Sequence, residues 1–372
     1  MMRERAPSSV FHLDTYRIRS GYYTDQYFNR TKALVAKFRP DTVVKMQVFQ
    51  KNHAVLGGID EAIAILRECS GEWEYPLGSN DSWCSRQPGL GQLKVHALRE
   101  VDAIEPFEPV LTIEGPYRLF AHLETVYLGV LARRTLIGTN VRKVINAANG
   151  KPIMYFPARH DHWAVQAGDG YTAHLAGVEG VSTDAQANWW GGKGMGTVPH
   201  SLIAAYGGDT VQAAMAFARE YGDETDVSVL VDFDNDCAET AVNVAEAFAK
   251  EGLSLWGVRL DTSDTLVDAG LFESGLGQFK PTGVCPELVH LVRRTLDDYG
   301  HHDVKIIVSG GFTPEKIARF EAEGVPVDSY GVGSSLLRGS NDFTADIVTV
   351  DGKPCAKVGR QEQSSDRLER VR

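Results

Sequence analysis

The sequence predicts an α/β protein whose larger part is a (β/α) barrel, complete or incomplete. Short apolar runs alternate with helical patterns about seven times over roughly 190 residues. Polar or glycine-rich residues follow these runs, where a barrel carries its functional groups. Two glycine-rich turns end the series, at the place where (β/α)8 barrels build a phosphate site from the loops after strands seven and eight.

Residues 1–118 have a different pattern and predict a separate small α+β domain. The apolar segments TVVKMQVFQ (42–50) and GQLKVHAL (91–98) predict strands, and GIDEAIAILREC (58–69) predicts an amphipathic helix. These segments lack the regular alternation that follows in the chain. We therefore place a domain boundary near residue 118.

Residues 119–340 are assigned to the barrel. Helical patterns reach about Ala148, and the alternation begins after it. The predicted strands are IMYFPA, VEGVST, GMGTVPH, VSVLVDF, LWGVRLD, KIIVSGG and VDSYGVG. The predicted helices between them include 209–221, 238–251, 284–299 and 314–323.

Residues 341–372 form a C-terminal segment. ADIVTV (345–350) predicts one more strand, which we expect to pack on the N-terminal domain. The polar end QEQSSDRLERVR is expected to fray, because termini without apolar anchors are commonly poorly ordered.

Composition narrows the classes of function. The formal charge of −11 disfavours nucleic acids and anionic membranes as partners. No apolar run approaches the length of a membrane span and no secretory signal is recognised, so we expect a cytoplasmic protein. Five separated cysteines and the isolated HDH triplet (160–162) predict neither a disulfide framework nor a metal site.

The two glycine-rich turns, in KIIVSGGFTPEKI (305–317) and VDSYGVGSSLL (327–337), predict a phosphate site. Glycines let backbone N–H groups approach an anion, and a helix is expected after the first turn. Thr313 is suited to cap that helix, with Pro314 in its first turn. The phosphate-binding candidates are Ser309, Gly310, Gly311, Gly331, Gly333 and Ser334.

Reactive side chains follow the other predicted strands. Arginines pair with carboxylates or phosphates, and carboxylates bind Mg²⁺ or ribose hydroxyls. Together with the glycine-rich turns, such a set fits a phosphosugar substrate. The candidates are Arg159, Ser182, Thr183, His200, Asp232, Arg259 and Asp261.

Several of these segments resemble the nicotinate phosphoribosyltransferase family, in particular its shorter, archaeal-like members. The motifs occur in the family's order and cover about residues 11–338. They are TDQYFNRTK (24–32), FPARHDH (156–162), GVST (180–183), GTVPHS (196–201), GVRLDTSD (257–264), SGG (309–311) and GVGSSLL (331–337).

The resemblance implies a barrel, an N-terminal α/β sandwich domain, and a homodimer with active sites near the subunit interface. It also implies an enzyme of NAD salvage that joins nicotinate to phosphoribosyl pyrophosphate. The products would be nicotinate mononucleotide and pyrophosphate. ATP would act as co-substrate with Mg²⁺ as cofactor.

The resemblance also assigns residue roles. His200 matches the histidine that the family phosphorylates from ATP, and Arg159 the arginine that meets the nicotinate carboxylate. Arg259 and Asp261 match an R-x-D pair at the ribose, where Asp232 either assists or helps to hold Mg²⁺. Tyr27 matches the aromatic residue that would stack on the pyridine ring across the dimer interface, and Arg30 would help to bind phosphates there.

Ser182 bears on the choice of acceptor. Related nicotinamide-using enzymes carry an aspartate at the matching position, which would repel a carboxylate, so serine favours nicotinate, the acid, over nicotinamide.

Two positions depart from the family pattern. Arg159 is followed by His160 where a second arginine is common, and Arg259 opens R-L-D-T-S-D instead of R-x-D-S-G-D.

Three alternatives remain open. The first is a phosphoribosyltransferase for nicotinamide or quinolinate. The second is a phosphosugar-binding barrel lyase with Lys193 as the Schiff-base residue, and the third is a sensor that binds a phosphosugar without turnover.

Overall fold

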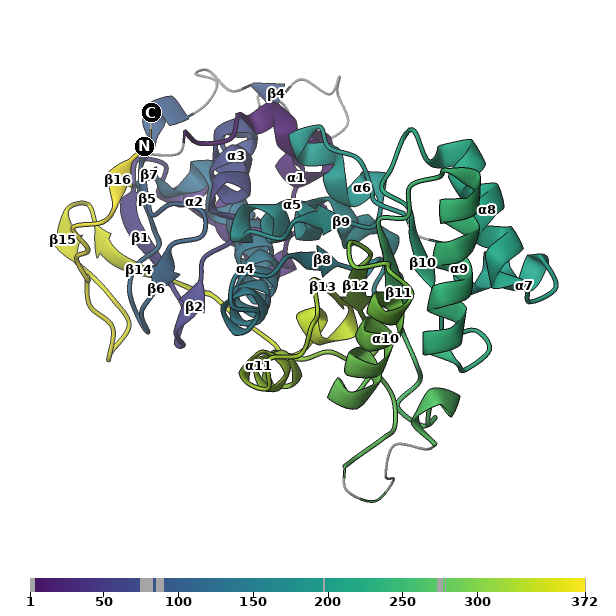
Figure 1. Cartoon of the computed structure of the whole chain (residues 1–372). Helices are drawn as coiled ribbons and strands as arrows, with labels where there is room; N and C mark the ends of the chain where they lie inside the picture. The colour runs from purple at the N-terminus through teal and green to yellow at the C-terminus, as the bar shows by residue number, and fades with distance from the viewer. Residues whose placement is uncertain are drawn as a thin grey trace. The chain divides into compact units, whose positions relative to one another are not determined.

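The computed structural model describes residues 4–73, 83–84, 90–196, 198–272, 277 and 279–371. The chain divides into two compact units (Figure 1). The first unit combines Met1–Thr139 with Gly339–Arg372, and the second is Asn140–Arg338. Among the described helices, none has the length and apolar character needed to cross a membrane.

An antiparallel sheet of six strands forms the centre of the first unit. The predicted strands at 42–50, 91–98 and 345–350 all belong to it, and the last of them pairs with the first. The sheet runs in the order β15 (Lys353–Pro354), β14 (Thr344–Val350), β1 (Val43–Phe49), β7 (Leu111–Pro116), β5 (Lys94–Ala97), β16 (Glu369–Arg370). Two short pairs accompany it, β2 (Ala54–Val55) with β6 (Ala103–Ile104) and β3 (Glu72–Trp73) with β4 (Trp83–Cys84).

Helix α3 (Ile59–Cys69) confirms the predicted helix at 58–69 and is buried along most of its length. Gly58 precedes it with a φ of +79°, a conformation that glycine adopts without a steric penalty. By contrast, α2 (Gln26–Phe38) has no buried residue. The remaining helices of more than one turn that begin in this unit are α1 (Thr15–Arg19) and α4 (Glu124–Ala147).

The expectation that the C-terminal end frays was wrong. Strand β16 pairs with β5, and Val371 is only 7% exposed. Glu369 forms an ion pair with Arg99, and Arg367 pairs with Glu108 at 3.0 Å. The polar composition did not indicate this ordered packing, because it depends on one buried apolar side chain and several ion pairs.

The second unit contains a six-stranded sheet in which every pairing is parallel. Its order is β10 (Ser228–Leu230), β11 (Gly257–Leu260), β12 (Lys305–Val308), β13 (Ser329–Val332), β8 (Ile153–Tyr155), β9 (Gly180–Val181). Two residues of the predicted strand GMGTVPH each donate one backbone hydrogen bond to an edge strand of this sheet. The N–H of Met195 donates to Val181 O at 2.7 Å, and the N–H of Val198 donates to Ser228 O at 3.1 Å.

The barrel prediction is therefore confirmed in a coarser form, as a parallel, half-barrel sheet with helices between its strands. Six strands are regular, and Met195 and Val198 make isolated contacts with their edges, so the described residues do not show a complete eight-stranded barrel. Short strands with few ladder hydrogen bonds explain why apolar patterning alone overstates closure.

Helices follow the strands of this sheet, and α9 (Cys237–Glu251) contacts both α8 (Thr210–Tyr221) and α10 (Pro286–Asp298) (Figure 1). Capping explains several of their limits. Asp236 accepts from the N–H of Glu239 to start α9, and Thr313 accepts from the N–H of Lys316 to start α11, with Pro314 in its first turn, as predicted. The helices are α5 (Gln166–Ala176), α6 (Asp184–Ala187), α7 (His200–Ala205), α8 (Thr210–Tyr221), α9 (Cys237–Glu251), α10 (Pro286–Asp298) and α11 (Pro314–Ala322).

Candidate active site

A cavity of about 650 Å³ lies in the second unit, lined mainly by residues at or just after the carboxyl ends of the parallel strands. Functional residues of (β/α) barrels gather at this edge. Most of the predicted site residues of the unit line the cavity: Arg159, Ser182, His200, Arg259, Asp261, Ser309, Gly310, Gly311, Gly331, Gly333 and Ser334.

Four predicted site residues lie elsewhere. Thr183 caps α6, accepting from the N–H of Gln186, and its hydroxyl donates to Gln166 Oε1. Asp232 lies behind His200, to which it is hydrogen-bonded. Tyr27 and Arg30 lie on α2 in the first unit, so their contacts with substrate stay predictions.

The two glycine-rich turns form one continuous wall of the cavity. Gly310 and Gly311 have φ values of +85° and +70°, and Ser335 Oγ donates to Phe312 O at 2.7 Å, which joins the turns. Within the described residues, the backbone N–H groups of Gly310, Gly311 and Ser334 donate to no acceptor. Consecutive amides with this geometry bind anions.

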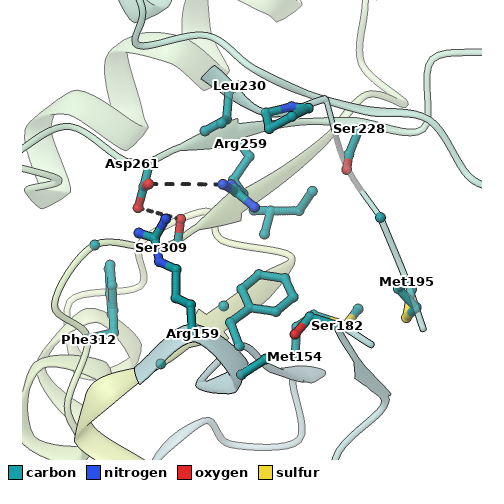
Figure 2. A pocket seen from close by; sticks show the side chains of 18 of the residues that line it. Met154, Arg159, Ser182, Met195, Ser228, Leu230, Arg259, Asp261, Ser309 and Phe312 are labelled. Carbon is teal, nitrogen blue, oxygen red and sulfur yellow. Dashed lines mark hydrogen bonds and ion pairs between the residues drawn. The ribbon is translucent and has the colours of Figure 1, made fainter. Parts of the chain in front are cut away.

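Asp261 is held beside the first turn. Ser309 Oγ donates to its Oδ1 at 2.8 Å, and Arg259 Nη2 lies 4.0 Å from its Oδ2. Figure 2 shows both interactions, with the guanidinium of Arg159 pointing toward the same side of the cavity. This carboxylate is positioned to accept hydrogen bonds from a sugar next to a bound phosphate.

Phe156 lines the cavity and was missed by the sequence analysis. The guanidinium of Arg259 lies 5.6 Å from the centroid of its ring, and the main chain of Gly331 passes close to the ring edge. The available signal was the two-residue period of a strand, because Phe156 follows β8 directly and lies two residues after Met154, which also lines the cavity. A planar aromatic ligand with a carboxylate fits this pair.

Burial lowers the pKa of Arg259, whereas the nearby carboxylates of Asp261 and Asp232 raise it. A guanidinium remains charged at neutral pH in either case. The side chain is 15% exposed, so its charge acts in a partly desolvated setting where electrostatic contacts are stronger than in water.

His200 and Asp232 form a hydrogen-bonded pair at the mouth of the cavity. Nε2 of His200 lies 2.9 Å from Oδ1 of Asp232, and the two side chains are 43% and 7% exposed. Because an ionised carboxylate only accepts, Nε2 carries the proton and Nδ1 keeps its lone pair. Burial raises the pKa of Asp232, and the hydrogen bond from His200 partly offsets that rise.

Ser182 is oriented by a buried glutamine. Gln186 Oε1 lies 3.0 Å from the backbone N and 3.1 Å from Oγ of Ser182, and Gln186 is 1% exposed. Because the backbone N–H of Ser182 can only donate, the Gln186 atom that faces it is the amide oxygen, and the Ser182 hydroxyl therefore also donates to this oxygen.

Other lining residues that the sequence analysis did not single out include Met195, Ser228, Trp256 and Asp226.

Within the described ranges, no group of three or more His, Cys, Asp or Glu side chains is arranged to hold a metal ion. Lys193 is not among the residues that line the cavity in the part of the chain that is described. A Schiff-base lyase centred on Lys193 therefore finds no support in this geometry.

Comparison with known proteins gives a consistent set of relatives, although no protein-family model matches the chain. Nicotinate phosphoribosyltransferase pncB1 of Mycobacterium tuberculosis is 30% identical over 268 residues, which cover 70% of this chain and 54% of that protein. The nicotinate phosphoribosyltransferase of Bacillus subtilis is 24% identical over 344 residues, covering 89% of this chain and 64% of that protein. The chain thus spans about half to two thirds of the length of these curated relatives.

Two solved structures are similar in fold. A nicotinate-nucleotide pyrophosphorylase from Pyrococcus furiosus superposes with a TM-score of 0.75 and 32% identity, covering 98% of this chain and 82% of that one. Human nicotinic acid phosphoribosyltransferase superposes with a TM-score of 0.66 at 18% identity, covering 91% and 77%.

Proposed function

Because the chain belongs to the nicotinate phosphoribosyltransferase family, we propose that it joins nicotinate to phosphoribosyl pyrophosphate. The products are nicotinate mononucleotide and pyrophosphate, and ATP hydrolysis is coupled to the reaction. The observation that carries this proposal is one cavity that combines an anion-binding pair of turns, a carboxylate beside them and an arginine stacked on an aromatic ring.

The glycine-rich turns suit the 5′-phosphate. Their unpaired amides point to an anion site, and the carboxylate of Asp261 lies directly beside them. In this arrangement Asp261 accepts hydrogen bonds from ribose hydroxyls and stabilises positive charge that develops on the sugar. No general base is required, because the pyridine nitrogen is already unprotonated at neutral pH.

The acceptor ring is proposed to stack on Phe156, with its carboxylate against Arg259. Since the guanidinium of Arg259 lies 5.6 Å from the centroid of the Phe156 ring, a planar acid packed against this ring would bring its carboxylate next to the guanidinium. Arg159, which the sequence analysis assigned to this carboxylate, points in Figure 2 toward Asp261 and Ser309. Its position suits phosphate or pyrophosphate oxygens as well.

His200 is the proposed site of phosphorylation by ATP. With Nε2 bound to Asp232, Nδ1 is the nucleophilic nitrogen, and the carboxylate stabilises the positive charge that the ring acquires. Mg²⁺ would be held by the carboxylate of Asp261, which lines the cavity, together with phosphate oxygens of the substrate. When bound, it would neutralise the pyrophosphate leaving group.

Helix α2 suits a subunit interface. None of its residues is buried, and Tyr27, Leu34 and Phe38 are 60%, 58% and 64% exposed. They recur at helical spacing and form an apolar stripe. A homodimer that covers this stripe would carry Tyr27 and Arg30 to the interface, as the family resemblance implies. We propose a cytoplasmic location, as the sequence analysis expects.

The test is pyrophosphate release by the purified protein with phosphoribosyl pyrophosphate and Mg²⁺. Nicotinate, nicotinamide and quinolinate are compared, each with and without ATP. We expect nicotinate-dependent release that ATP stimulates, and loss of that stimulation in His200→Ala. His162→Ala, an exposed histidine outside the cavity lining, is the matched control.

Other outcomes assign the site differently. Release with nicotinamide or quinolinate instead of nicotinate would keep the reaction class and change the acceptor. The absence of release with every acceptor would overturn the enzymatic assignment and favour a phosphosugar-binding protein.

A further inference from the structure

His160 lies next to the phosphate-binding turns. It ends the short 3₁₀ helix η5 (Ala158–His160) after β8 and lines the cavity. A methyl group on Gly333 would lie 2.9 Å from Cε1 and 3.3 Å from Nδ1 of its ring. The nitrogen-bearing edge of the imidazole therefore faces the main chain of the second turn.

The backbone next to this ring is suited to an anion. The N–H groups of Ser334 and Ser335 have no acceptor within the described residues, and Ser335 links the second turn to the first through Phe312 O. A phosphate bound to these amides would lie at the imidazole edge. We propose that His160 is a phosphate-binding side chain whose protonation sets the affinity of the turns for a dianionic phosphate group.

The proposal deepens the proposed function and rests on it for the identity of the phosphate ester. An imidazolium has two N–H donors and a positive charge, whereas a neutral imidazole has one N–H donor and one lone pair, which repels a phosphate oxygen. Affinity for a dianion is thus expected to fall when the ring loses its proton. An arginine at this position would remove that dependence, because guanidinium stays charged.

The charged or titratable neighbours of His160 on its own segment include Asp161 and His162. Asp161 Oδ1 accepts from the N–H of His162, and His162 Nδ1 accepts from the N–H of Ala164. The main chain of Gly333, which faces the ring, carries no ionisable side chain. On the first turn, Lys316 Nζ donates to Gly310 O at 3.5 Å, and burial lowers the pKa of Lys316 to about 8. The other charged or titratable residues of the cavity lining are Arg159, His200, Asp226, Arg259 and Asp261.

Calorimetric titration with sulfate and with ribose 5-phosphate between pH 5.5 and 8.5 tests the proposal. Sulfate is the main probe because it stays a dianion over this range. We expect the affinity of the unaltered protein to fall about fivefold as pH rises, the scale of one partly exposed charge contact. His160→Gln should show the weak, high-pH affinity throughout, and His160→Arg the tight one.

His162→Gln and Lys316→Arg are the controls, and both should keep the pH dependence of the unaltered protein, because arginine keeps the charge at position 316 without titrating in this range. The proposal is overturned if His160→Gln retains that dependence, or if sulfate does not bind. Its failure is separable from that of the proposed function. A pH-dependent sulfate site without turnover would contradict only the enzymatic activity, whereas turnover with an unchanged profile in His160→Gln would contradict only the role of His160.

Discussion

Nε2 of His200 donates a hydrogen bond of 2.9 Å to Oδ1 of Asp232, a carboxylate that is almost entirely buried. The imidazole itself is 43% exposed at the mouth of the cavity. This pairing fixes the tautomer and leaves Nδ1 as the free nitrogen. A surface histidine held by a buried acid is suited to accept a phosphoryl group and return it to water.

Asp232→Asn should separate the ATP-coupled step from the transfer step. The amide still accepts a hydrogen bond but lacks the charge that stabilises a cationic ring, so ATP stimulation of pyrophosphate release should fall about 10- to 100-fold. Release without ATP should change less than about threefold. Equal losses with and without ATP would contradict a role for Asp232 through His200.

The same substitution makes a prediction about stability and pH. Burial raises the pKa of Asp232 in the folded state above its unfolded value. The folded state therefore binds the proton more tightly, and this favourable contribution is lost as pH rises from the ordinary carboxyl range through the raised pKa. Urea unfolding should show the unaltered protein losing stability relative to Asp232→Asn over that window. Parallel curves would contradict the shift.

Arg259→Lys tests the proposed acceptor site. Lysine keeps the charge but loses the planar fork and the stacking on Phe156. The KM for nicotinate should rise about 10- to 100-fold, with a much smaller change for phosphoribosyl pyrophosphate. Arg159→Lys is the comparison, expected to affect phosphoribosyl pyrophosphate more. The reverse pattern in steady-state kinetics would return the carboxylate to Arg159.

Gly331→Ala should disturb the ring of Phe156 directly. An added methyl group would lie 2.6 Å from Cε2 and 2.8 Å from Cδ2 of that ring, so the phenyl group has to move. We expect the KM for nicotinate to rise about tenfold. Gly129→Ala is the control, because a methyl group there meets no atom within 4 Å. An unchanged KM would place the acceptor ring away from Phe156.

Val371→Asp tests the packing of the C-terminal segment. It puts a charge at a position that is 7% exposed beside β5, and should lower the free energy of unfolding by about 2–3 kcal/mol. Val358→Asp is the matched control at a valine that is 99% exposed, with an expected change within about 0.5 kcal/mol. Equal midpoints in urea for both variants would show that the segment does not contribute to stability.

Much of the fold and of the site is readable from local patterns. Apolar runs and helical periodicity located the regular strands of the second unit and its helices α8, α9, α10 and α11, and Thr313 with Pro314 predicted the start of α11. The principle that barrel chemistry lies at the carboxyl ends of strands predicted Asp261, Ser309 and the glycine-rich turns as site residues, and they line the cavity. These features depend on neighbours within a few residues, and the sequence alone therefore determined them.

Other features depend on residues that are distant in the chain, and only the tertiary structure decided them. The stacking of Arg259 on Phe156, the position of His160 against Gly333 and the burial of Val371 beside β5 each join segments whose local patterns do not refer to one another. The number of regular strands in the half-barrel is of the same kind. Periodicity reports which face of an element is apolar, whereas packing determines which partner that face meets.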